Sequence, residues 1–514
     1  MAACLARRVA AVILGTTLLG GCALPPPENR TVSHALPAAQ ARATALGQAI
    51  GPLADAHPGL SGIHALADAH DAFAARALLI QAAQKTLDVQ YYIWRGDMTG
   101  TLLLEALFNA AERGVRVRLL LDDNGIAGLD DVLAALDTHP NIEVRLFNPF
   151  TVRRPKMLGY LTDFARLNRR MHNKSLTADN QATIIGGRNV GDEYFGAADD
   201  VLFADLDLLA AGQVVGEVSA DFDRYWASQS AYPAAALLDM PDAAQLPMLH
   251  RSASRFEKDP AALAYMNALR DLPFIRQMLA RQLPFEWAPA RMLSDDPAKA
   301  LGQAPDGVTL ADQLQHVLGQ PASHLELVSP YFVPTAAGTD AFVQMVQRGV
   351  QVRVLTNAYE ATDVAVVHSG YAKRRKDLLR GGVQLYEMRS QSQAKPPGQG
   401  PFGSSGSSLH AKTFAVDGKR VFVGSFNFDP RSMHLNTELG FVIDSPVLAG
   451  QMADTFEQGI SRQAYRVGLA DDGHLYWTAD GDGGRQRYDT EPGTSWWQRL
   501  LIWLLSLLPI EPLL

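Results

Sequence analysis

The sequence predicts an α/β fold of two pseudo-symmetric halves, each a mixed, mostly parallel β-sheet covered by helices. Three observations lead to this prediction. A strand, a helix and a second strand follow one another over 86–123 and again over 325–357. The pattern Arg-Gly-Val-x-Val-Arg joins the helix to the second strand in both places, at 113–118 and at 348–353. A His-x-Lys motif then follows in each half. One repetition at this length indicates a duplicated domain and not a solenoid.

The elements of the first half follow from residue type and spacing. Residues 86–93 are mostly β-branched, aliphatic or aromatic, as expected of a strand. Leucine and alanine recur every three or four residues over 100–113, which predicts a helix that Gly114 ends. A further apolar run, 115–123, predicts the next strand.

The second half repeats this order. Residues 325–332 predict a strand, a helix ends at Arg348 and Gly349, and residues 350–357 predict the next strand. Strands joined through a helix usually lie parallel within one sheet. Each half should therefore contain a helix-covered parallel unit.

Composition narrows the class of protein. The chain has 514 residues, a length that suggests two large domains or three ordinary ones. Its 46 Lys and Arg residues against 54 Asp and Glu give a net charge of −8, which disfavours a dedicated nucleic-acid-binding protein. A hydrophobic fraction of 47% excludes wholesale disorder. Two cysteines cannot build a disulfide framework or a four-cysteine metal site.

Shifts in composition divide the chain. Residues 231–320 are helix-prone, contain proline breaks and have no counterpart elsewhere, so we interpret them as a connecting insertion. The low-complexity segment 391–408 ends directly before the second motif and is either a lid over the site or a surface insertion. The predicted divisions are a signal peptide 1–21, a Pro/Ala-rich tether 22–60, the first half 61–230, the insertion 231–320, the second half 321–465 and a C-terminal tail 466–514.

The N-terminal segment has the pattern of a secretion signal. Arg7 and Arg8 precede an apolar run, 9–19, that is too short to span a membrane. Leu-Gly-Gly-Cys at 19–22 follows and resembles the lipobox of bacterial lipoproteins, in which the cysteine receives a diacylglycerol and becomes the mature N-terminus. This resemblance implies a lipidated Cys22 and a membrane-anchored protein that faces the periplasm, on the inner or the outer membrane. An ordinary signal peptide with a coincidental cysteine is the alternative.

Two matched motifs are the main candidates for chemistry. They contain His172, Lys174, Asp179 and Asn189 in the first half, and His410, Lys412, Asp417 and Asn427 in the second. In each copy the lysine follows the histidine by two residues, the aspartate by seven and the asparagine by seventeen. A single His-x-Lys pair would carry little information, whereas two copies with matched spacing on corresponding elements are specific. The competing interpretation, that both histidines are only structural, is disfavoured by the matched spacing.

The spacing within each motif suits phosphate chemistry. In an extended strand, residues two apart point to the same face, so each histidine should project with its lysine into one cleft. The lysines would supply positive charge, and the asparagines further hydrogen bonds, to phosphate oxygens. Histidine is both a nucleophile and a general acid near neutral pH. Two histidines that face a phosphodiester therefore permit one to attack while the other protonates the leaving oxygen.

These motifs resemble the paired HKD motifs of the phospholipase D superfamily, and matching flanks extend over nearly the whole mature chain. Segments such as 167–174 and 424–438 look particularly like bacterial cardiolipin synthases of the C type. The resemblance implies a sandwich of two α/β halves around one metal-independent site that needs no cofactor, with phosphatidyl transfer through a covalent phosphohistidine. It assigns His172 as the nucleophile and His410 as the acid that protonates the departing alcohol.

The resemblance also gives roles to other residues. It places Lys174, Asp179, Lys412 and Asp417 in the catalytic set with the two histidines, although the aspartates mainly support the fold in this family. It makes Asn189, Ser425, Asn427 and Glu438 candidates for substrate binding. Glu438 and, less firmly, Asp205 resemble the carboxylates that orient the opposing histidines. Gly187 stands where the second motif has Ser425, which puts in doubt a hydroxyl contact in the first half.

Two further features suggest contact with lipid. Residues 495–508 are apolar and rich in tryptophan, so they form either a helix at the membrane interface or a terminal helix docked on the core. Basic clusters at 153–156, 169–170 and 373–376 contrast with the acidic average of the chain. A solvated face is the default for each cluster, but the cluster beside His172 favours anionic headgroups.

The expected function is transfer of a phosphatidyl group to phosphatidylglycerol, which makes cardiolipin. Hydrolysis at the same site, as a phospholipase D, is one alternative, and a secreted nuclease is another. The acidic charge and the anchor pattern weigh against the nuclease, and two intact motifs weigh against an inactive scaffold. The expected partners are therefore the membrane and its phospholipids, phosphatidylglycerol and phosphatidylethanolamine, with no nucleic acid. The sequence leaves open which phospholipid is the donor.

Overall fold

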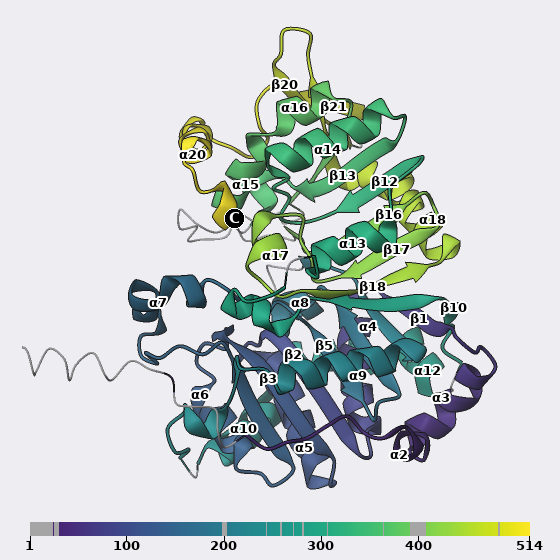
Figure 1. Ribbon diagram of the computed structural model, residues 1–514, viewed down its shortest axis with the longest axis vertical. Coiled ribbons are helices and arrows are strands. Elements are labelled where there is room, and N and C mark those ends of the chain that lie inside the picture. Colours follow the sequence, from purple (N-terminus) through teal and green to yellow (C-terminus); the bar gives the residue numbers. More distant parts are fainter. Residues whose placement is uncertain are drawn as a thin grey trace, which may run out of the picture.

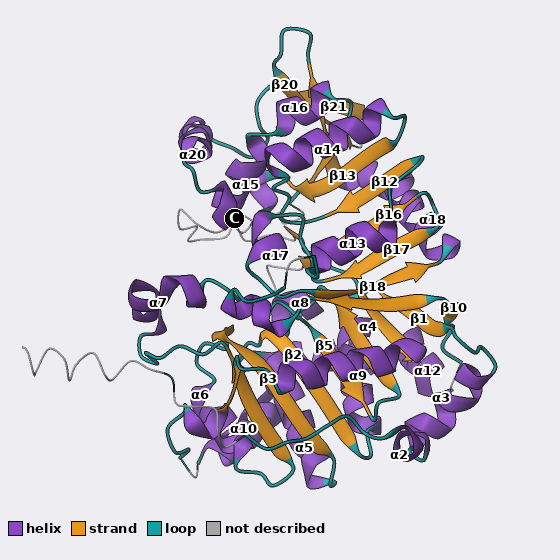
Figure 2. Ribbon diagram, in the orientation of Figure 1, coloured by secondary structure: helices purple, strands orange, loops and turns teal. Residues whose placement is uncertain are grey.

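The computed structural model describes Leu24 and residues 30–514, apart from 198–202, 243, 257–259, 271, 280–281, 306, 363, 391–407 and 482–483. Figure 1 shows two halves stacked along the long axis, the first half below and the second above. Each half holds one large sheet with helices against it, as Figure 2 shows by secondary structure. The predicted α/β fold of two similar halves is confirmed.

The first half is built on a nine-stranded sheet of order β10-β1-β8-β6-β5-β2-β3-β4-β9. Its strands are β1 (Ser61–Leu66), β2 (Thr86–Ile93), β3 (Arg116–Gly125), β4 (Ile142–Phe147), β5 (Ser175–Ala178), β6 (Ala182–Gly186), β8 (Asp207–Gly212), β9 (Ala231–Pro233) and β10 (Glu286–Ala288). The predicted strands at 86–93 and 115–123 are β2 and β3.

The second half is built on a ten-stranded sheet of order β11-β18-β17-β16-β12-β13-β14-β19-β20-β21. Its strands are β11 (Ala290–Ser294), β12 (His324–Val328), β13 (Gln351–Asn357), β14 (Gln384–Met388), β16 (Thr413–Val416), β17 (Arg420–Gly424), β18 (Leu439–Asp444), β19 (Ala464–Leu469), β20 (Leu475–Gly481) and β21 (Gly484–Tyr488). β12 ends earlier than predicted, before Pro330, which has no amide hydrogen to donate to a ladder.

The sheets are mixed, as predicted, but they are not mostly parallel. Among the described strands of these two sheets, parallel pairing is confined to β2-β3-β4 and to β12-β13-β14. The other neighbouring strands described in the two sheets pair antiparallel. The βαβ units supply the parallel strands, whereas tight turns join β5 to β6 and β16 to β17, and a tight turn joins only antiparallel neighbours.

Helices cover both faces of each sheet. Those that precede β11 are α2 (Ala38–Arg42), α3 (Ala45–Asp55), α4 (Ala69–Ala82), α5 (Met98–Glu112), α6 (Asp130–Asp137), η2 (Lys156–Leu158), α7 (Gly159–Leu167), α8 (Asp192–Phe195), α9 (Gln213–Trp226), η3 (Ala234–Ala236), α10 (Gln245–Phe256), α11 (Pro260–Arg270) and α12 (Pro273–Leu279). Those that follow are η4 (Pro297–Leu301), α13 (Leu310–Leu318), α14 (Thr335–Gln347), η5 (Tyr359–Ala361), α15 (Ala365–Ala372), α16 (Arg375–Arg380), α17 (Pro430–His434), α18 (Pro446–Asp454), η6 (Thr455–Gly459), α19 (Ile460–Gln463), α20 (Trp496–Leu507) and η7 (Glu511–Leu513).

Alternation along β3 shows how the layers form. Leu119 and Leu121 pack into the core that includes α4 and α5, whereas Leu120 packs with Phe222 and Trp226 of α9 on the opposite face. Successive side chains of a strand point to opposite faces, so an apolar run buries both sides of the sheet. The continuous apolar character of residues 119–121 thus reflects helices on both faces.

The two halves meet along strands that carry the motifs. Apolar residues of β6 and β8 pack with residues of β17 and β18 in one buried cluster that includes Ile185, Leu208, Val423 and Phe441. β10 and β11 are separated only by Pro289, yet β10 belongs to the first sheet and β11 to the second. This connection and the shared core hold the two sheets against each other.

Three predicted divisions need correction. The tether was predicted to end at residue 60, but α2 and α3 fold within it, and the Thr44 hydroxyl caps α3 by accepting from the Gly47 amide. The insertion is not separate, since Tyr265 and Phe274 lie in the first core. The second half extends past 465, because β19, β20 and β21 continue its sheet. Propensity marks these segments as helix or strand, but only tertiary packing decides which half they join.

Candidate active site

Backbone hydrogen bonds between the two halves fix the position of each motif histidine. The His172 amide donates to the Thr437 carbonyl at 2.8 Å, and the His410 amide donates to the Ala204 carbonyl at 2.8 Å. The hydrogen bond of His410 continues a small parallel pair of strands, β7 (Phe203–Ala204) with β15 (Ser408–Leu409). Thr437 and Ala204 each directly precede a carboxylate residue. The backbone of each half therefore carries a carboxylate to the histidine of the other half.

The two histidines and two carboxylates form crossed pairs. His172 Nδ1 lies 2.8 Å from Glu438 Oε2, and His410 Nδ1 lies 2.6 Å from Asp205 Oδ2. All four side chains are buried. A carboxylate at Nδ1 fixes the ring orientation and the tautomer, so Nε2 is the nitrogen that can attack or protonate a substrate. Glu438, also a candidate for substrate binding, lies in the orienting position behind His172 that the resemblance implies, and Asp205 occupies the matching position behind His410.

Both motif lysines turn toward their own histidines. Lys174 Nζ donates to the His172 carbonyl at 2.6 Å, and Lys412 Nζ lies 3.0 Å from His410 Nδ1. The charge of each lysine also lowers the pKa of the histidine in the opposite half. The two motifs, more than 200 residues apart in the chain, therefore converge on one site, as the sequence predicted.

Burial keeps both imidazoles neutral near pH 7. Burial, and then the charges of Lys174 and Lys412, hold the pKa of His172 well below its usual value. Burial and the Lys412 charge lower the pKa of His410 to about 4, against the opposing effect of Asp205. Burial also holds the pKa of Lys174 well below its usual range. A phosphate anion in the site would offset these effects, because its negative charge favours every protonated group around it.

The two carboxylates differ in their electrostatics. Burial raises the pKa of Glu438 to about 7, although Lys174 and the Ser425 hydroxyl favour its anion. Asp205 is also buried, but His410 and Lys412 hold its pKa well below the usual range. His410 is therefore backed by a firmly ionised carboxylate, and His172 by a carboxyl group that titrates near neutrality.

Gly187 and Ser425, which occupy matching positions, are explained by these carboxylates. A Cβ atom on Gly187 would lie 2.0 Å from Asp205 Oδ1 and 2.7 Å from the carboxyl carbon, so glycine leaves the space that the aspartate fills. In the second half the Ser425 hydroxyl donates to Glu438 Oε2, and Ser432 donates to Oε1 at 2.9 Å. Each half thus holds its carboxylate in its own way. Gly187 leaves space for Asp205, and the Ser425 hydroxyl binds Glu438. Ser425 supports Glu438 in this arrangement.

The motif aspartates do not lie beside the histidines. Asp179 follows β5 at the end opposite His172, and its carboxylate accepts from the amides of Gln84, Lys85 and Thr86 at 2.7–2.9 Å. Asp417 accepts from the amides of residues 322–324 in the same way. Both aspartates tie a turn to the start of the central strand, β2 or β12. The resemblance names them with the catalytic set, but their contacts are those of the fold-supporting role that it also implies.

The motif asparagines lie in different environments. Asn189 Oδ1 accepts from the Ile93 amide at 3.2 Å, and its Nδ2 donates to the Tyr194 hydroxyl at 3.0 Å. Asn427 is buried, and its Oδ1 has no hydrogen-bond partner within the described part of the chain. Asn189 therefore holds neighbouring parts of the protein together, whereas Asn427 retains a side-chain oxygen, unpaired among the described residues, that can accept a hydrogen bond.

Two tyrosines at the site were not predicted. The Tyr92 ring lies edge-on to His172 with centroids 5.1 Å apart, and Tyr194 lies edge-on to His410 at 5.4 Å. Lys174 Nζ also lies 5.5 Å from the centre of the Tyr92 ring. Each ring covers one side of an imidazole and limits its rotation. The sequence shows both as aromatic residues, but no regular spacing relates them to the motifs.

Most residues of the basic clusters make internal contacts. Arg170, beside the first motif, is buried and donates to the Arg169 carbonyl. Lys156 Nζ lies 2.9 Å from Asp123 Oδ1, and Arg374 lies 2.8 Å from Glu511. Arg170 also lies 3.4 Å from Asp122, and the expectation that the cluster beside His172 attracts anionic headgroups stays a prediction.

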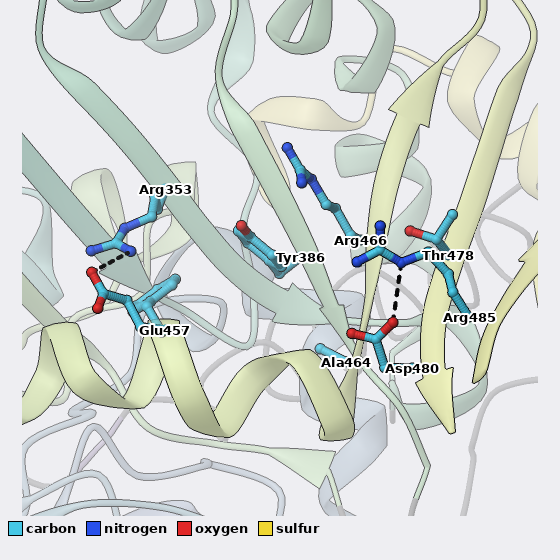
Figure 3. A pocket seen from close by; sticks show the side chains of 9 residues that line it. Arg353, Tyr386, Glu457, Ala464, Arg466, Thr478, Asp480 and Arg485 are labelled. Atoms are coloured by element: carbon cyan, nitrogen blue, oxygen red, sulfur yellow. Dashed lines mark hydrogen bonds and ion pairs between the residues drawn. The ribbon is translucent and has the colours of Figure 1, made fainter. Parts of the chain in front are cut away.

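The described part of the chain offers no cluster of metal ligands, and its polar hollow on the second sheet has internal ion pairs. Among the described residues, no group of three or more His, Cys, Asp and Glu side chains is arranged to hold a metal ion. A hollow on the second sheet is shown in Figure 3, lined by Arg353, Tyr386, Arg466 and Arg485 among others. Arg353 pairs there with Glu457 at 3.8 Å and Arg485 with Asp480 at 3.1 Å, so its charge is largely neutralised.

Two carboxylate-backed histidines and two lysines around one point define an enzyme site for phosphodiester transfer. The family model described as "Cardiolipin synthase, PLD-like domain" matches residues 78–226 and 314–460, one segment in each half. The chain belongs to this family of the phospholipase D superfamily.

Individual relatives agree with this assignment. The chain is 49% identical to cardiolipin synthase C of Escherichia coli over 91% of its own length and 99% of that protein. It is 33% identical to a Helicobacter pylori protein over 87% and 88% of the two chains. The crystal structure of phosphatidylserine synthase from Haemophilus influenzae superposes with a TM-score of 0.54 at 14% identity, covering 82% of this chain and 92% of that one. That last likeness shows a shared fold.

Proposed function

We propose that this protein is a cardiolipin synthase, which transfers a phosphatidyl group to phosphatidylglycerol through a phosphohistidine. The observation that carries the proposal is the pair of crossed contacts, His172 with Glu438 and His410 with Asp205. A site with two carboxylate-backed nitrogen bases suits two successive transfers at one phosphorus atom. The near full-length similarity to cardiolipin synthase C supports the choice of substrate class.

The first transfer forms the covalent intermediate. Nε2 of His172 attacks the phosphorus of the donor, a P–N bond forms, and the P–O bond to the departing alcohol breaks. Nε2 of His410 gives its proton to that alcohol. Lys174 and Lys412 stabilise the negative charge on the equatorial oxygens as it develops.

The second transfer reverses these roles. A hydroxyl of phosphatidylglycerol enters the place of the departed alcohol and loses its proton to His410. Its oxygen attacks phosphorus, the new P–O bond forms, and the P–N bond breaks. The phosphodiester energy is kept in the intermediate, so the exchange needs no nucleotide.

The electrostatic difference between the two pairs supports His172 as the nucleophile. A nucleophilic imidazole must be neutral, and the pKa of His172 is held well below its usual value. A general acid must carry a proton, which the ionised Asp205 favours on His410 once phosphate charge has entered the site. We infer that His410 therefore acts as acid and then as base.

Water in place of the lipid hydroxyl would make the same site a phospholipase D. We propose transfer over hydrolysis because both histidines are buried, which limits the access of water to the intermediate. Phosphatidylethanolamine is the proposed donor and phosphatidylglycerol the alternative. Expression in a bacterial host without cardiolipin, followed by lipid analysis, tests the function. Cardiolipin should appear, and formation of phosphatidic acid alone would establish the hydrolase.

We further propose that the protein is a lipoprotein anchored through Cys22 and facing the periplasm. The residues that support this, 19–22, lie outside the described part of the chain. Among the described residues no helix has the length and apolarity needed to cross a membrane. Labelled fatty acid should enter the wild-type protein and not the Cys22→Ser variant; equal labelling of both would overturn the proposal.

A further inference from the structure

Large exposed hydrophobic side chains gather on two segments. The first, the α7 patch, consists of Met157, Leu158, Leu161 and Phe164. The second, the α20 patch, consists of Trp496, Trp497, Leu500, Trp503, Leu504 and Leu507. Ten of the nineteen large hydrophobic residues exposed in the described part of the chain belong to these two patches.

The patches lie on the same side of the molecule, one on each half. Figure 1 shows α7 at the left of the first half and α20 at the left of the second, with the C-terminus between them. α20 packs against α15 and buries Ile502, while Trp496 is 71% exposed. The alternatives left by the sequence, docked helix or interfacial helix, are therefore compatible: one face docks on the protein and the other stays open.

Arg431 connects both patches to the active site. Its guanidinium donates to the carbonyl of Asn168, the residue that follows α7, at 2.8 Å. Its amide donates to the carbonyl of Leu514, beyond α20, at 2.7 Å. Arg431 lies four residues after Asn427, and its charge contributes to the lowered pKa of His172.

A second path joins the α7 patch to the nucleophile. The Tyr160 hydroxyl of α7 donates to Asn124 Oδ1 at 3.2 Å, and Asn124 Nδ2 lies 3.5 Å from the Tyr92 hydroxyl. The Tyr92 ring in turn lies against His172. Contacts thus lead from both patches toward His172. The α7 patch belongs to the first half and the α20 patch to the second.

We propose that the α7 and α20 patches, one on each half, dock the enzyme on a lipid bilayer. The inference rests on the proposed function, because the substrates of that function reside in the bilayer. Three indoles on one short helix suit the interface between headgroups and acyl chains. At twelve residues, α20 is about 18 Å long and lies along the surface without crossing the hydrocarbon core.

Apolar contact drives this docking, and charge contributes little. Arg374, near α20, is paired with Glu511, and Lys156, near α7, is paired with Asp123. Their cations are therefore committed within the protein. Docking should depend weakly on ionic strength and on the fraction of anionic lipid, unlike binding through a polybasic patch.

The test separates docking from chemistry by presenting the same substrate in two forms. Vesicles of phosphatidylcholine that contain phosphatidylethanolamine and phosphatidylglycerol present donor and acceptor in a bilayer, and short-chain forms of both lipids below their micellar concentrations present them as monomers. The variants of the full chain are Trp496→Ser/Trp497→Ser/Trp503→Ser and Leu161→Ser/Phe164→Ser. Met240→Ser is the matched control, since Met240 is 92% exposed and lies in neither patch.

Each patch variant should lose about tenfold or more of its activity on vesicles and keep its activity on the monomer within about twofold. The control should be unchanged on both, and the wild type should tolerate high salt. Equal loss on both substrates, or no loss on vesicles, would overturn the proposal. So would a wild-type dimer that the patch variants dissociate, because the patches would then be a self-interface.

If the wild type turns over neither substrate, the proposed function fails and the docking is judged separately. Tryptophan fluorescence is then measured with phosphatidylcholine vesicles whose acyl chains carry bromine. The α20 indoles should be quenched in the wild type, and the signal should not be quenched in the triple serine variant. An unquenched wild type would overturn the docking itself.

Discussion

Glu438 Oε2 lies 2.8 Å from His172 Nδ1, although 266 residues separate them in the chain. The contact crosses the boundary between the two halves, and His410 with Asp205 repeats it in the opposite direction. Neither half therefore holds a complete catalytic pair. The site exists only when both halves are folded and packed together, which gives a physical reason for keeping the duplicated domains in one chain.

The raised pKa of Glu438 predicts a pH-dependent contribution to stability. Burial raises this pKa from 4.5 to about 7, so the folded state holds a proton that the unfolded state releases earlier. The contribution is complete below pH 4.5 and is lost as the pH rises through 7. The difference in unfolding free energy between wild type and Glu438→Gln should therefore change by about 3 kcal/mol across this range. Denaturant titrations at several pH values measure it, and a pH-independent difference would contradict the assignment.

A reciprocal exchange tests the matched glycine and serine. Glu438→Asp alone should lower kcat by about 10²-fold, because the shorter side chain withdraws from His172. Adding Ser425→Gly reproduces the arrangement of Gly187 with Asp205 and should recover part of the loss. Gly187→Ser should inactivate the enzyme, because its Cβ would meet the Asp205 carboxylate at 2.0 Å. Wild type, Glu438→Asp, Ser425→Gly and the variant with both changes form a double-mutant cycle, and strict additivity of their kinetic effects would rule out the coupling.

The motif aspartates should affect stability more than chemistry. Asp179→Asn weakens an acceptor of three backbone amides at the start of β2 and should cost about 1–3 kcal/mol of unfolding free energy. The kcat per folded molecule should stay within about threefold of wild type, since the side chain does not contact the histidines. Active-site titration against folded protein gives this value. A large loss of kcat at unchanged stability would return Asp179 to the catalytic set.

The two histidines should respond differently to the leaving group. His410→Ala should lower the rate by about 10²–10⁴-fold with an ordinary phospholipid. A donor with an acidic leaving alcohol, such as a nitrophenyl phosphodiester, needs little protonation and should recover much of the rate. His172→Ala should not be recovered by the same donor. Equal recovery of both variants would mean that the roles are shared or reversed.

Most of the fold could be predicted from the sequence, because the patterns that mark strands and helices are local. The strands over 86–93 and 350–357 and the intervening helices follow from residue type, spacing and helix-ending glycines. The sheets contain fewer parallel strands than the βαβ pattern predicts, because Asp179 and Asp417 lie in hairpin turns that join antiparallel strands. Their backbone φ angles of 51° and 54° show the tight-turn conformation.

Only the site residues in or near the two motifs could be predicted from the sequence. Matched spacing identified the histidines and lysines, and Glu438 was found through its place after the second motif. Asp205 is the weaker candidate in the sequence because the match after the first motif is looser, and Gly187 makes room for its carboxylate in the structure. Tyr92 and Tyr194 reach the histidines through tertiary packing, which leaves no fixed spacing in the sequence.

The covalent intermediate is the central claim, and trapping it is the most direct measurement. The enzyme is mixed with a donor labelled at phosphorus and quenched in alkaline denaturant, because a phosphohistidine hydrolyses in acid. Peptide mapping should place the label on the peptide that contains His172, with chelator present or absent, and His410→Ala with an activated donor should increase its yield. Label on the His410 peptide would reverse the two roles. A reaction that requires a divalent cation and labels neither peptide would contradict the mechanism.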